Sequence, residues 1–173
     1  TYDSKTLALS VETQNGMEIN RTTDTLGRDT GFSLAGADYG VSYAYDTYGR
    51  FVAVTSLVSS VPFVANYSYL PNTDLIFGRS LEIGNSLLAV GYSYEPARSL
   101  ITSVENRHDE TVISRYDYTN DALGRRTSRA DSGQAFEAQP TYGDSATVEM
   151  PAYNAYSYNT RSEVTGAARR WGT

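Results

Sequence analysis

A tyrosine-rich stretch at residues 43–51, Tyr-Ala-Tyr-Asp-Thr-Tyr-Gly-Arg-Phe, returns in weaker copies along the chain. Each copy has two tyrosines separated by one residue: Tyr43 and Tyr45, Tyr67 and Tyr69, Tyr92 and Tyr94, Tyr116 and Tyr118, and Tyr156 and Tyr158. The steps between the second tyrosines are 24, 25, 24 and 40 residues. Three nearly equal steps are typical of a repeat array, in which each unit packs mainly on its neighbours.

Each repeat has the pattern of a β-hairpin. Residues two apart in a strand share one face, so a tyrosine pair places two rings side by side. A polar turn follows, best formed between Asp46 and Gly49, where Asp can bond its own backbone and Gly can take a positive φ. A second strand then begins near Phe51. We therefore expect an all-β chain of consecutive antiparallel β-hairpins that forms an open, curved or spiralling sheet.

The unit Tyr-Asp-x-x-Gly-Arg followed by an apolar residue resembles the YD repeats of the bacterial Rhs family. The match is clearest at Tyr45, Asp46, Gly49, Arg50 and Phe51. The remaining copies are less complete. Two extra residues separate the tyrosines from Gly124 and Arg125, the copy at residues 24–28 lacks its tyrosine pair, and Leu70, Glu95 and Asn159 replace the turn aspartate elsewhere.

The resemblance extends over residues 2–165, with residues 131–150 as an irregular insertion. We expect residues 1–173 to form one YD-repeat region and to be a fragment of a larger repeat protein. In Rhs and toxin-complex proteins, YD hairpins join into a hollow shell around a toxic C-terminal polypeptide. The resemblance therefore implies a wall segment of a secreted or cell-surface bacterial protein, with neighbouring repeats and an enclosed toxin or cargo as its partners.

Composition excludes several classes of function. A formal charge of −6 argues against a general nucleic-acid binder. The chain has no cysteine, and His108 is its only histidine, which leaves no multi-histidine metal site. No nucleotide-binding glycine pattern and no stretch long enough for a membrane-spanning helix is present. We expect no cofactor, no metal, no membrane insertion and no enzymatic activity.

Carboxylates in or beside the repeat turns raise the alternative of a glycosidase, whose reaction needs a pair of them. Asp46, Glu95 and Asp117 are the candidates. Because they recur with the architecture, we interpret them as turn-forming residues. Arg50 and Arg125, which follow turn glycines, are expected to pair with acidic side chains or to lie over tyrosine rings.

The tyrosines have two interpretations. Rings such as Tyr67, Tyr69, Tyr92 and Tyr94 can form a platform for carbohydrate, as in an adhesin-like surface module. Alternatively, they form a ladder that packs successive hairpins together. We favour the ladder and keep the glycan-binding module as the second hypothesis.

Turn residues give the expected strand boundaries. Asn15-Gly16 predicts a tight hairpin turn, and the charged stretch that includes His108 predicts the tip of another hairpin. The expected strands lie at 5–14, 16–23, 41–45, 50–58, 61–69, 74–77, 80–83, 86–94, 99–106 and 111–118, with a last hairpin at 152–168. An array segment has edge strands, so we also expect protected edges or self-association.

Overall fold

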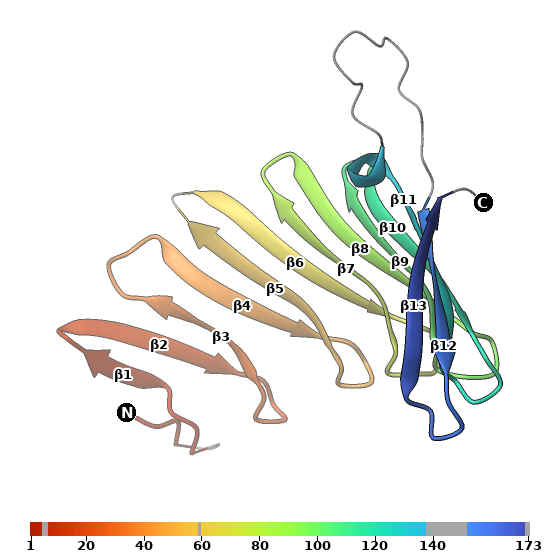
Figure 1. Cartoon of the computed structure of the whole chain (residues 1–173). Coiled ribbons are helices and arrows are strands. Elements are labelled where there is room, and N and C mark those ends of the chain that lie inside the picture. The colour runs from red at the N-terminus through yellow and green to blue at the C-terminus, as the bar shows by residue number, and fades with distance from the viewer. Residues whose placement is uncertain (5–6, 59, 138–151, 172–173) are drawn as a thin grey trace, which may run out of the picture. The chain divides into compact units, whose positions relative to one another are not determined.

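A computed structural model describes residues 1–4, 7–58, 60–137 and 152–171 of the chain. In this part of the chain there are thirteen β-strands and one short 3-10 helix, and the strand order in the sheet is the order in the sequence (Figure 1). The paired strands run antiparallel, and β1 and β13 are the two ends of the order. The expected all-β fold of consecutive hairpins in an open sheet is confirmed. Its curvature stays a prediction.

The chain divides into two compact units, Thr1–Leu87 and Leu88–Thr173. The first contains β1 (Val11–Gln14), β2 (Met17–Thr23), β3 (Asp29–Leu34), β4 (Tyr39–Tyr45), β5 (Phe51–Val58), β6 (Val61–Tyr69) and β7 (Ile76–Ile83). Asn15 and Gly16 link β1 and β2 with φ of 53° and 78°, which confirms the predicted tight turn. The two short strands expected at 74–77 and 80–83 are one continuous strand, β7, because Gly78 stays in the ladder opposite Ser68.

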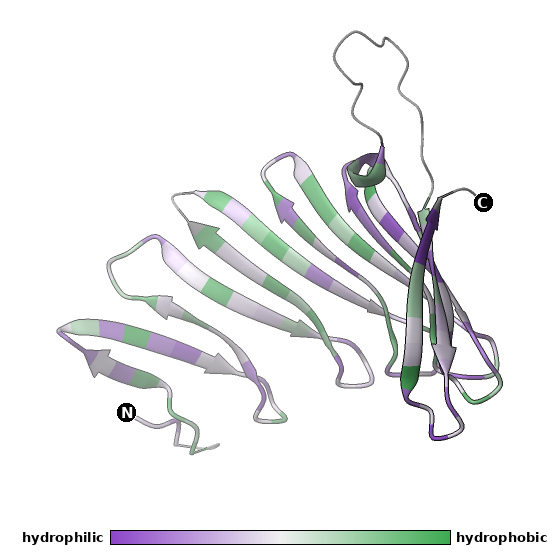
Figure 2. Ribbon diagram, viewed as in Figure 1, coloured by the Kyte–Doolittle hydropathy of each residue, from purple (hydrophilic) through white to green (hydrophobic). Residues whose placement is uncertain are grey.

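The two faces of the first unit differ in composition. One face carries the row Tyr43, Val54, Ala65 and Leu81, paired in register across β4 to β7. Beside it the Phe51 ring lies 6.0, 5.7 and 5.5 Å from the rings of Tyr43, Tyr45 and Tyr67. The opposite face carries the small or polar row Ala44, Ala53, Asn66 and Ser80. Hydrophobic and hydrophilic bands alternate along the first residues of β2, Met-Glu-Ile-Asn (Figure 2).

Most of the second unit is formed by β8 (Ser86–Tyr94), β9 (Ile101–His108), β10 (Thr111–Asn120), β11 (Arg126–Ser132), η1 (Gln134–Phe136), β12 (Ala152–Tyr158) and β13 (Val164–Trp171). Its aromatic face carries the row Tyr92, Val104, Tyr116, Asp131 and Ala152. Helix η1 packs on this face, with the ring of Phe136 at 5.7 Å from that of Tyr116. The expected insertion at 131–150 begins inside β11, and its residues 138–150 lie outside the described part of the chain.

The described residues bury few side chains completely. Ala152, at 2% exposure, is the single fully buried apolar side chain among them, and Asp131 is equally buried. The rings of the repeat tyrosine pairs and of Phe51 are half-buried instead, whereas Tyr48 and Phe77 are exposed. The stability of the sheet therefore depends on contacts between neighbouring strands of the same layer. For the same reason, contacts in the turns between strands contribute a larger share of the stability.

Candidate functional site

The most regular constellation in the described residues is a set of turns at one end of the hairpins. In the Asp46 turn, one carboxylate oxygen accepts hydrogen bonds from the backbone N–H groups of Tyr48 and Arg50, both at 2.9 Å. The Asp46 N–H donates to the Arg50 carbonyl at 2.9 Å, and Gly49 takes a φ of 84°. The Asp24 and Asp121 turns have the same bonds. An aspartate at this position is therefore a turn former, as its side-chain length allows.

The arginine that ends each of these turns closes it with a charged contact. Arg50 Nε donates to the second carboxylate oxygen of Asp46 at 2.7 Å, and Arg28 with Asp24 and Arg125 with Asp121 repeat the geometry. The backbone N–H of Arg125 is the largest contribution that lowers the pKa of Asp121, and the guanidinium lowers it further. Burial opposes ionisation of Asp46, but its hydrogen bonds from Arg50 outweigh burial and lower its pKa as well.

The same arginine also reaches forward to the next repeat. The Arg50 guanidinium lies 4.5 Å from the centre of the Tyr69 ring, and its Nη1 donates to the carbonyl of Thr73 in the next turn. The Tyr69 hydroxyl completes the link, because it donates to the carbonyl of Phe51 at 2.7 Å, and Phe51 directly follows Arg50. We call this combination of turn carboxylate, arginine and next tyrosine the turn clasp.

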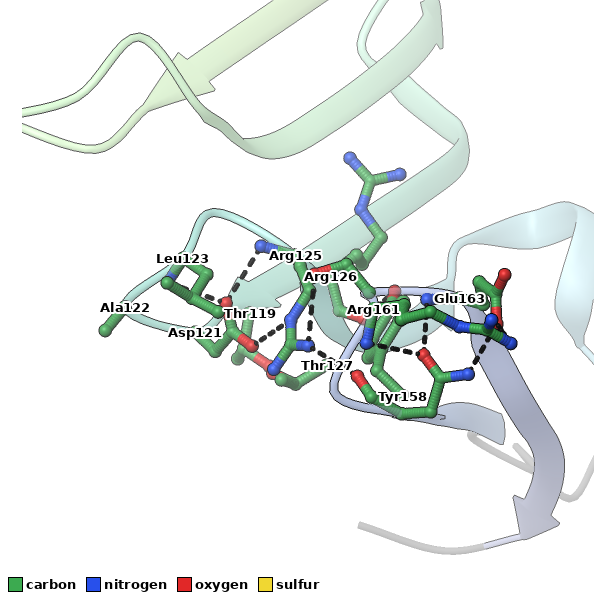
Figure 3. A network of polar contacts seen from close by, with 12 residues as sticks. Thr119, Asp121, Ala122, Leu123, Arg125, Arg126, Thr127, Tyr158, Arg161 and Glu163 are labelled. Carbon is green, nitrogen blue, oxygen red and sulfur yellow. Dashed lines mark hydrogen bonds and ion pairs between the residues drawn. The ribbon is translucent and has the colours of Figure 1, made fainter.

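The turn clasp occurs three times in the described residues. Arg28 lies 4.3 Å from the Tyr45 ring, and the Tyr45 hydroxyl donates to the Asp29 carbonyl at 2.9 Å. Arg125 lies 4.8 Å from the centre of the Tyr158 ring. The Tyr158 hydroxyl donates to the carbonyl of Arg126, the residue after Arg125, at 2.7 Å. Figure 3 shows Arg125 between the Asp121 turn, whose carboxylate it contacts, and Tyr158. Each clasp therefore joins two consecutive turns in the same direction along the chain.

Three turns depart from the pattern: the Leu70 turn has neither its carboxylate nor its arginine, and the Glu95 and Asn159 turns keep part of it. In the Glu95 turn, Arg98 Nε donates to the Glu95 carboxylate at 2.7 Å, and Arg98 Nη1 reaches the Asp121 carbonyl at 2.8 Å. In the Asn159 turn, the asparagine oxygen accepts the N–H of Arg161 at 2.9 Å and that of Glu163 at 3.0 Å, as the aspartates do. Two other residues of the turn differ, because Ser162 with φ of 65° stands in the glycine position and Glu163 in the arginine position.

The predicted repeat residues do not all take part in a clasp. The three clasps contain Tyr45, Asp46, Gly49, Arg50, Tyr69, Gly124, Arg125 and Tyr158, and their tyrosines are the last residues of β4, β6 and β12. The strand residues outside these three clasps are Tyr43, Tyr67, Tyr92, Tyr94, Tyr116, Tyr118 and Tyr156. Arg126 lies 3.5 Å from the ring of Tyr118. The residue directly before the Asp121 turn, where Tyr45 stands in the best copy, is Asn120.

The prediction from the sequence that Asp117 belongs to a repeat turn is wrong. Asp117 is a strand residue of β10, not a turn residue, and Arg115 holds it with contacts of 2.9 and 2.8 Å. Arg115 is also the main reason that the pKa of Asp117 is lowered. The residue that sequence reasoning missed is Asp121, and the spacing Asp-x-x-Gly-Arg shared with Asp24 and Asp46 is the signal that identifies it.

The tyrosines proposed for glycan binding are engaged within the protein. Arg50 covers the Tyr69 ring and the Tyr69 hydroxyl is used, while the Tyr67 ring packs on Phe51. Burial raises the pKa of Tyr94, with a further contribution from the neighbouring Tyr92. These contacts match the ladder interpretation, in which the rings hold hairpins together.

His108 lies at the end of β9, with its Nε2 3.6 Å from a carboxylate oxygen of Asp109. Within the described residues, no three His, Cys, Asp or Glu side chains are grouped so that they could hold a metal ion. The described part of the chain contains no helix that is long and apolar enough to cross a membrane.

Comparisons with known proteins give a structural similarity. No family model and no curated protein matches the chain. The fold is similar to the structure titled Photorhabdus luminescens Tc holotoxin pore, mutation TccC3-D651A, with a TM-score of 0.45 and 15% sequence identity. The match covers 90% of this chain and 9% of that one, so this chain spans about a tenth of the other's length.

Proposed function

We propose that this chain is a non-catalytic structural segment of a larger YD-repeat protein, where it builds part of a shell wall around a C-terminal toxin or other cargo. The turn clasp carries the proposal. It recurs in three of the repeat turns, joins each of these three to the following turn, and consists of groups that already satisfy one another. Repeated contacts of this kind hold successive repeats of a sheet together. An active site, in contrast, requires catalytic groups at one place that are available to bind a substrate.

The composition of the two sheet faces also fits a wall. In the first unit an aromatic face lies opposite a face of small and polar side chains, so the two sides of the layer differ in chemistry. Such a layer can separate an interior from an exterior without a second layer of structure. The proposal places the parent protein outside the cytoplasm, as a secreted or cell-surface protein of a bacterium.

Protease protection in the intact parent protein tests the proposal. The polypeptide C-terminal to the array is given an affinity tag, and its cleavage by thermolysin is followed in the wild type and in an Arg50→Ala, Arg125→Ala double variant. We expect the tagged polypeptide to be protected in the wild type and cleaved faster in the double variant. Arg161→Ala is the control, because this arginine is 78% exposed and pairs with Glu163 within its own turn.

Equal cleavage of the tagged polypeptide in the wild type and in the free, separately expressed form would overturn the shell proposal. A glycan array with the isolated chain addresses the alternative in parallel. Saturable binding of a sugar that Tyr67→Ala abolishes, in a variant with an unchanged circular dichroism spectrum, would favour the glycan-binding module instead.

A further inference from the structure

A surface cavity of about 350 Å³ is formed by the Asp46 turn and the Leu70 turn of the first unit. Its volume falls within the range of about 300–1,000 Å³ that is usual for small-ligand pockets. The lining residues are Tyr48, Arg50, Asn72, Thr73 and Asp74. The clasp uses the Arg50 guanidinium and the Thr73 carbonyl, whereas the other three lining side chains take no part in it.

The Asp74 carboxylate differs from the carboxylates of the other repeat turns. Each of those contacts an arginine of its own turn within 3.0 Å, in the pairs Asp24 with Arg28, Asp46 with Arg50, Glu95 with Arg98, Asp121 with Arg125 and Glu163 with Arg161. The Leu70 turn has no arginine, and the exposed Asp74 forms no hydrogen bond or ion pair within the described residues. Asp46 and Asp74 around Arg50 therefore leave one uncompensated negative charge beside the cavity.

The Tyr48 ring gives the cavity an aromatic side. Tyr48 is 77% exposed although Arg50 lies 5.2 Å from the centre of its ring, and its hydroxyl forms no hydrogen bond within the described part of the chain. Leu26 and Leu123, which are similarly exposed, occupy the same position in the Asp24 and Asp121 turns. Because leucine forms the same turn, the turn itself does not require an aromatic ring at this position.

A carboxylate and a tyrosine ring are the two groups that hold a guanidinium in each clasp. Arg50, for example, donates to Asp46 at 2.7 Å and lies 4.5 Å from the centre of the Tyr69 ring. Asp74 and Tyr48 bring the same two kinds of group to the cavity. A planar guanidinium can donate two parallel hydrogen bonds to a carboxylate and can stack on an aromatic face, whereas a lysine ammonium acts as a point charge.

The Asn72 side chain adds a group that suits a peptide. Its amide also has no hydrogen-bond partner in the described residues. An asparagine amide has a donor and an acceptor side by side, as a peptide group does, so the two can pair. A ligand with a peptide group next to its cation therefore matches the cavity better than a free organic cation.

We propose that this cavity binds an arginine side chain of another polypeptide. The guanidinium donates to the Asp74 carboxylate and lies against the Tyr48 ring, and the Asn72 amide pairs with a peptide group next to the arginine. The formal charge of −6 on the chain attracts a cationic partner. The site is independent of a role in a shell, because the residues that form it all lie in two adjacent turns of this chain.

NMR titration of the isotope-labelled chain with a blocked tripeptide, acetyl-Gly-Arg-Gly-amide, tests the site. We expect saturable shifts of backbone amides that are confined to the Asp46 and Leu70 turns. The same tripeptide with citrulline in place of arginine keeps the shape and loses the charge, and it should bind at least about tenfold more weakly. The lysine tripeptide and free arginine should also bind more weakly, because the first lacks the planar group and the second lacks the peptide groups.

Two substitutions in the cavity separate the charge from the ring. Asp74→Asn should lower the affinity for the arginine tripeptide about tenfold, and Tyr48→Leu, which keeps the turn of the Asp24 and Asp121 copies, should lower it about two- to fivefold. Glu110→Gln is the control, because it removes an exposed carboxylate from a hairpin of the second unit and should leave the affinity unchanged. Unchanged amide shifts outside the two turns show that each variant is folded.

Four outcomes would overturn the inference in whole or in part. Absence of saturable shifts at the two turns, or an affinity that Asp74→Asn leaves unchanged, would remove the site. Equal binding of the citrulline or lysine tripeptide would show that the cavity does not recognise a guanidinium. Equal binding of free arginine would show that the ligand is a small molecule and not another polypeptide.

Discussion

The stacking of Arg50 on Tyr69 is the part of the clasp that links one repeat to the next, and a double-mutant cycle can isolate it. Arg50→Met keeps the length of the side chain and removes the guanidinium, and Tyr69→Leu keeps an apolar side chain and removes the ring. Both native side chains are partly buried, and the guanidinium lies 4.5 Å from the ring centre. We expect the two substitutions to be non-additive.

The expected coupling free energy follows from the burial of the pair. A cation over an aromatic ring contributes about 0.5–1 kcal/mol at an exposed site and about 2 kcal/mol or more when desolvated. The Arg50 side chain is 20% exposed, so the coupling should be roughly 1 kcal/mol. Tyr69→Phe separates the hydroxyl from the ring, since it removes only the 2.7 Å bond to the Phe51 carbonyl and should cost about 1 kcal/mol.

Urea unfolding followed by far-ultraviolet circular dichroism gives the free energies, and hydrogen exchange at the amides of the Asp46 and Leu70 turns shows where each variant opens. The control cycle combines Arg161→Met with Tyr69→Leu, because these residues lie in different units and should be additive within about 0.3–0.5 kcal/mol. A coupling between Arg50 and Tyr69 no larger than that of the control would refute the role of the clasp as a link between repeats.

Three further outcomes are expected. The folded-state pKa of Asp46 is lowered, so its contribution to stability is complete above the unfolded pKa and is lost as pH falls through the folded value; urea midpoints should fall with acidification, and less so in Asp46→Asn. Gly31→Ala should cost more than about 2 kcal/mol of unfolding free energy, because its Cβ would lie 2.1 Å from a carbonyl oxygen, whereas Gly91→Ala, with open space around it, should be nearly neutral. Ser162→Gly should stabilise by about 1 kcal/mol, since the serine has a φ of 65°, and Gly49→Ser, at the equivalent position with a φ of 84°, should destabilise by a similar amount; thermal unfolding measures both.

Local patterns in the sequence were sufficient to predict the hairpins. The two-residue period of the tyrosine faces and the Asn15-Gly16 turn depend on neighbours in the chain, and strands such as β6 and β8 begin and end where the pattern predicts. The charged tip near His108 is likewise a hairpin turn, with Asp109 at a φ of 51°. These features follow from backbone geometry that a few consecutive residues decide.

The register near the turns was harder to predict. The ladder shifts by a residue between Ala44 and Tyr45, and at the corresponding point between Thr119 and Asn120. Both shifts fall directly before the turn aspartate, so they do not distinguish the two copies. The tyrosine pair of β10 lies farther from its turn because Thr119 and Asn120 separate Tyr118 from Asp121, which is why Asp117 was mistaken for a turn residue. A β-bulge depends on pairing with a distant strand and leaves no local composition signal.

The contacts of the arginines with the tyrosine of the next repeat were still harder to predict from the sequence. Arg50 and Arg125 were expected to meet an acidic side chain or a tyrosine ring, and the structure shows each meeting both at once. The partner ring comes from the following repeat, and its position depends on the register of two intervening strands. The sequence identifies the residue types, whereas the pairing of repeats requires the folded sheet.

The directional clasp changes what counts as a cooperative unit in this sheet. A hairpin with its own core could open alone, but these strands bury few apolar side chains and share their turns' hydrogen bonds with the next repeat. Loss of Arg50 removes a contact from the Asp46 turn and another from the Leu70 turn, so opening of one turn weakens the next. We therefore expect the smallest cooperative unit to be a pair of adjacent repeats joined by a clasp.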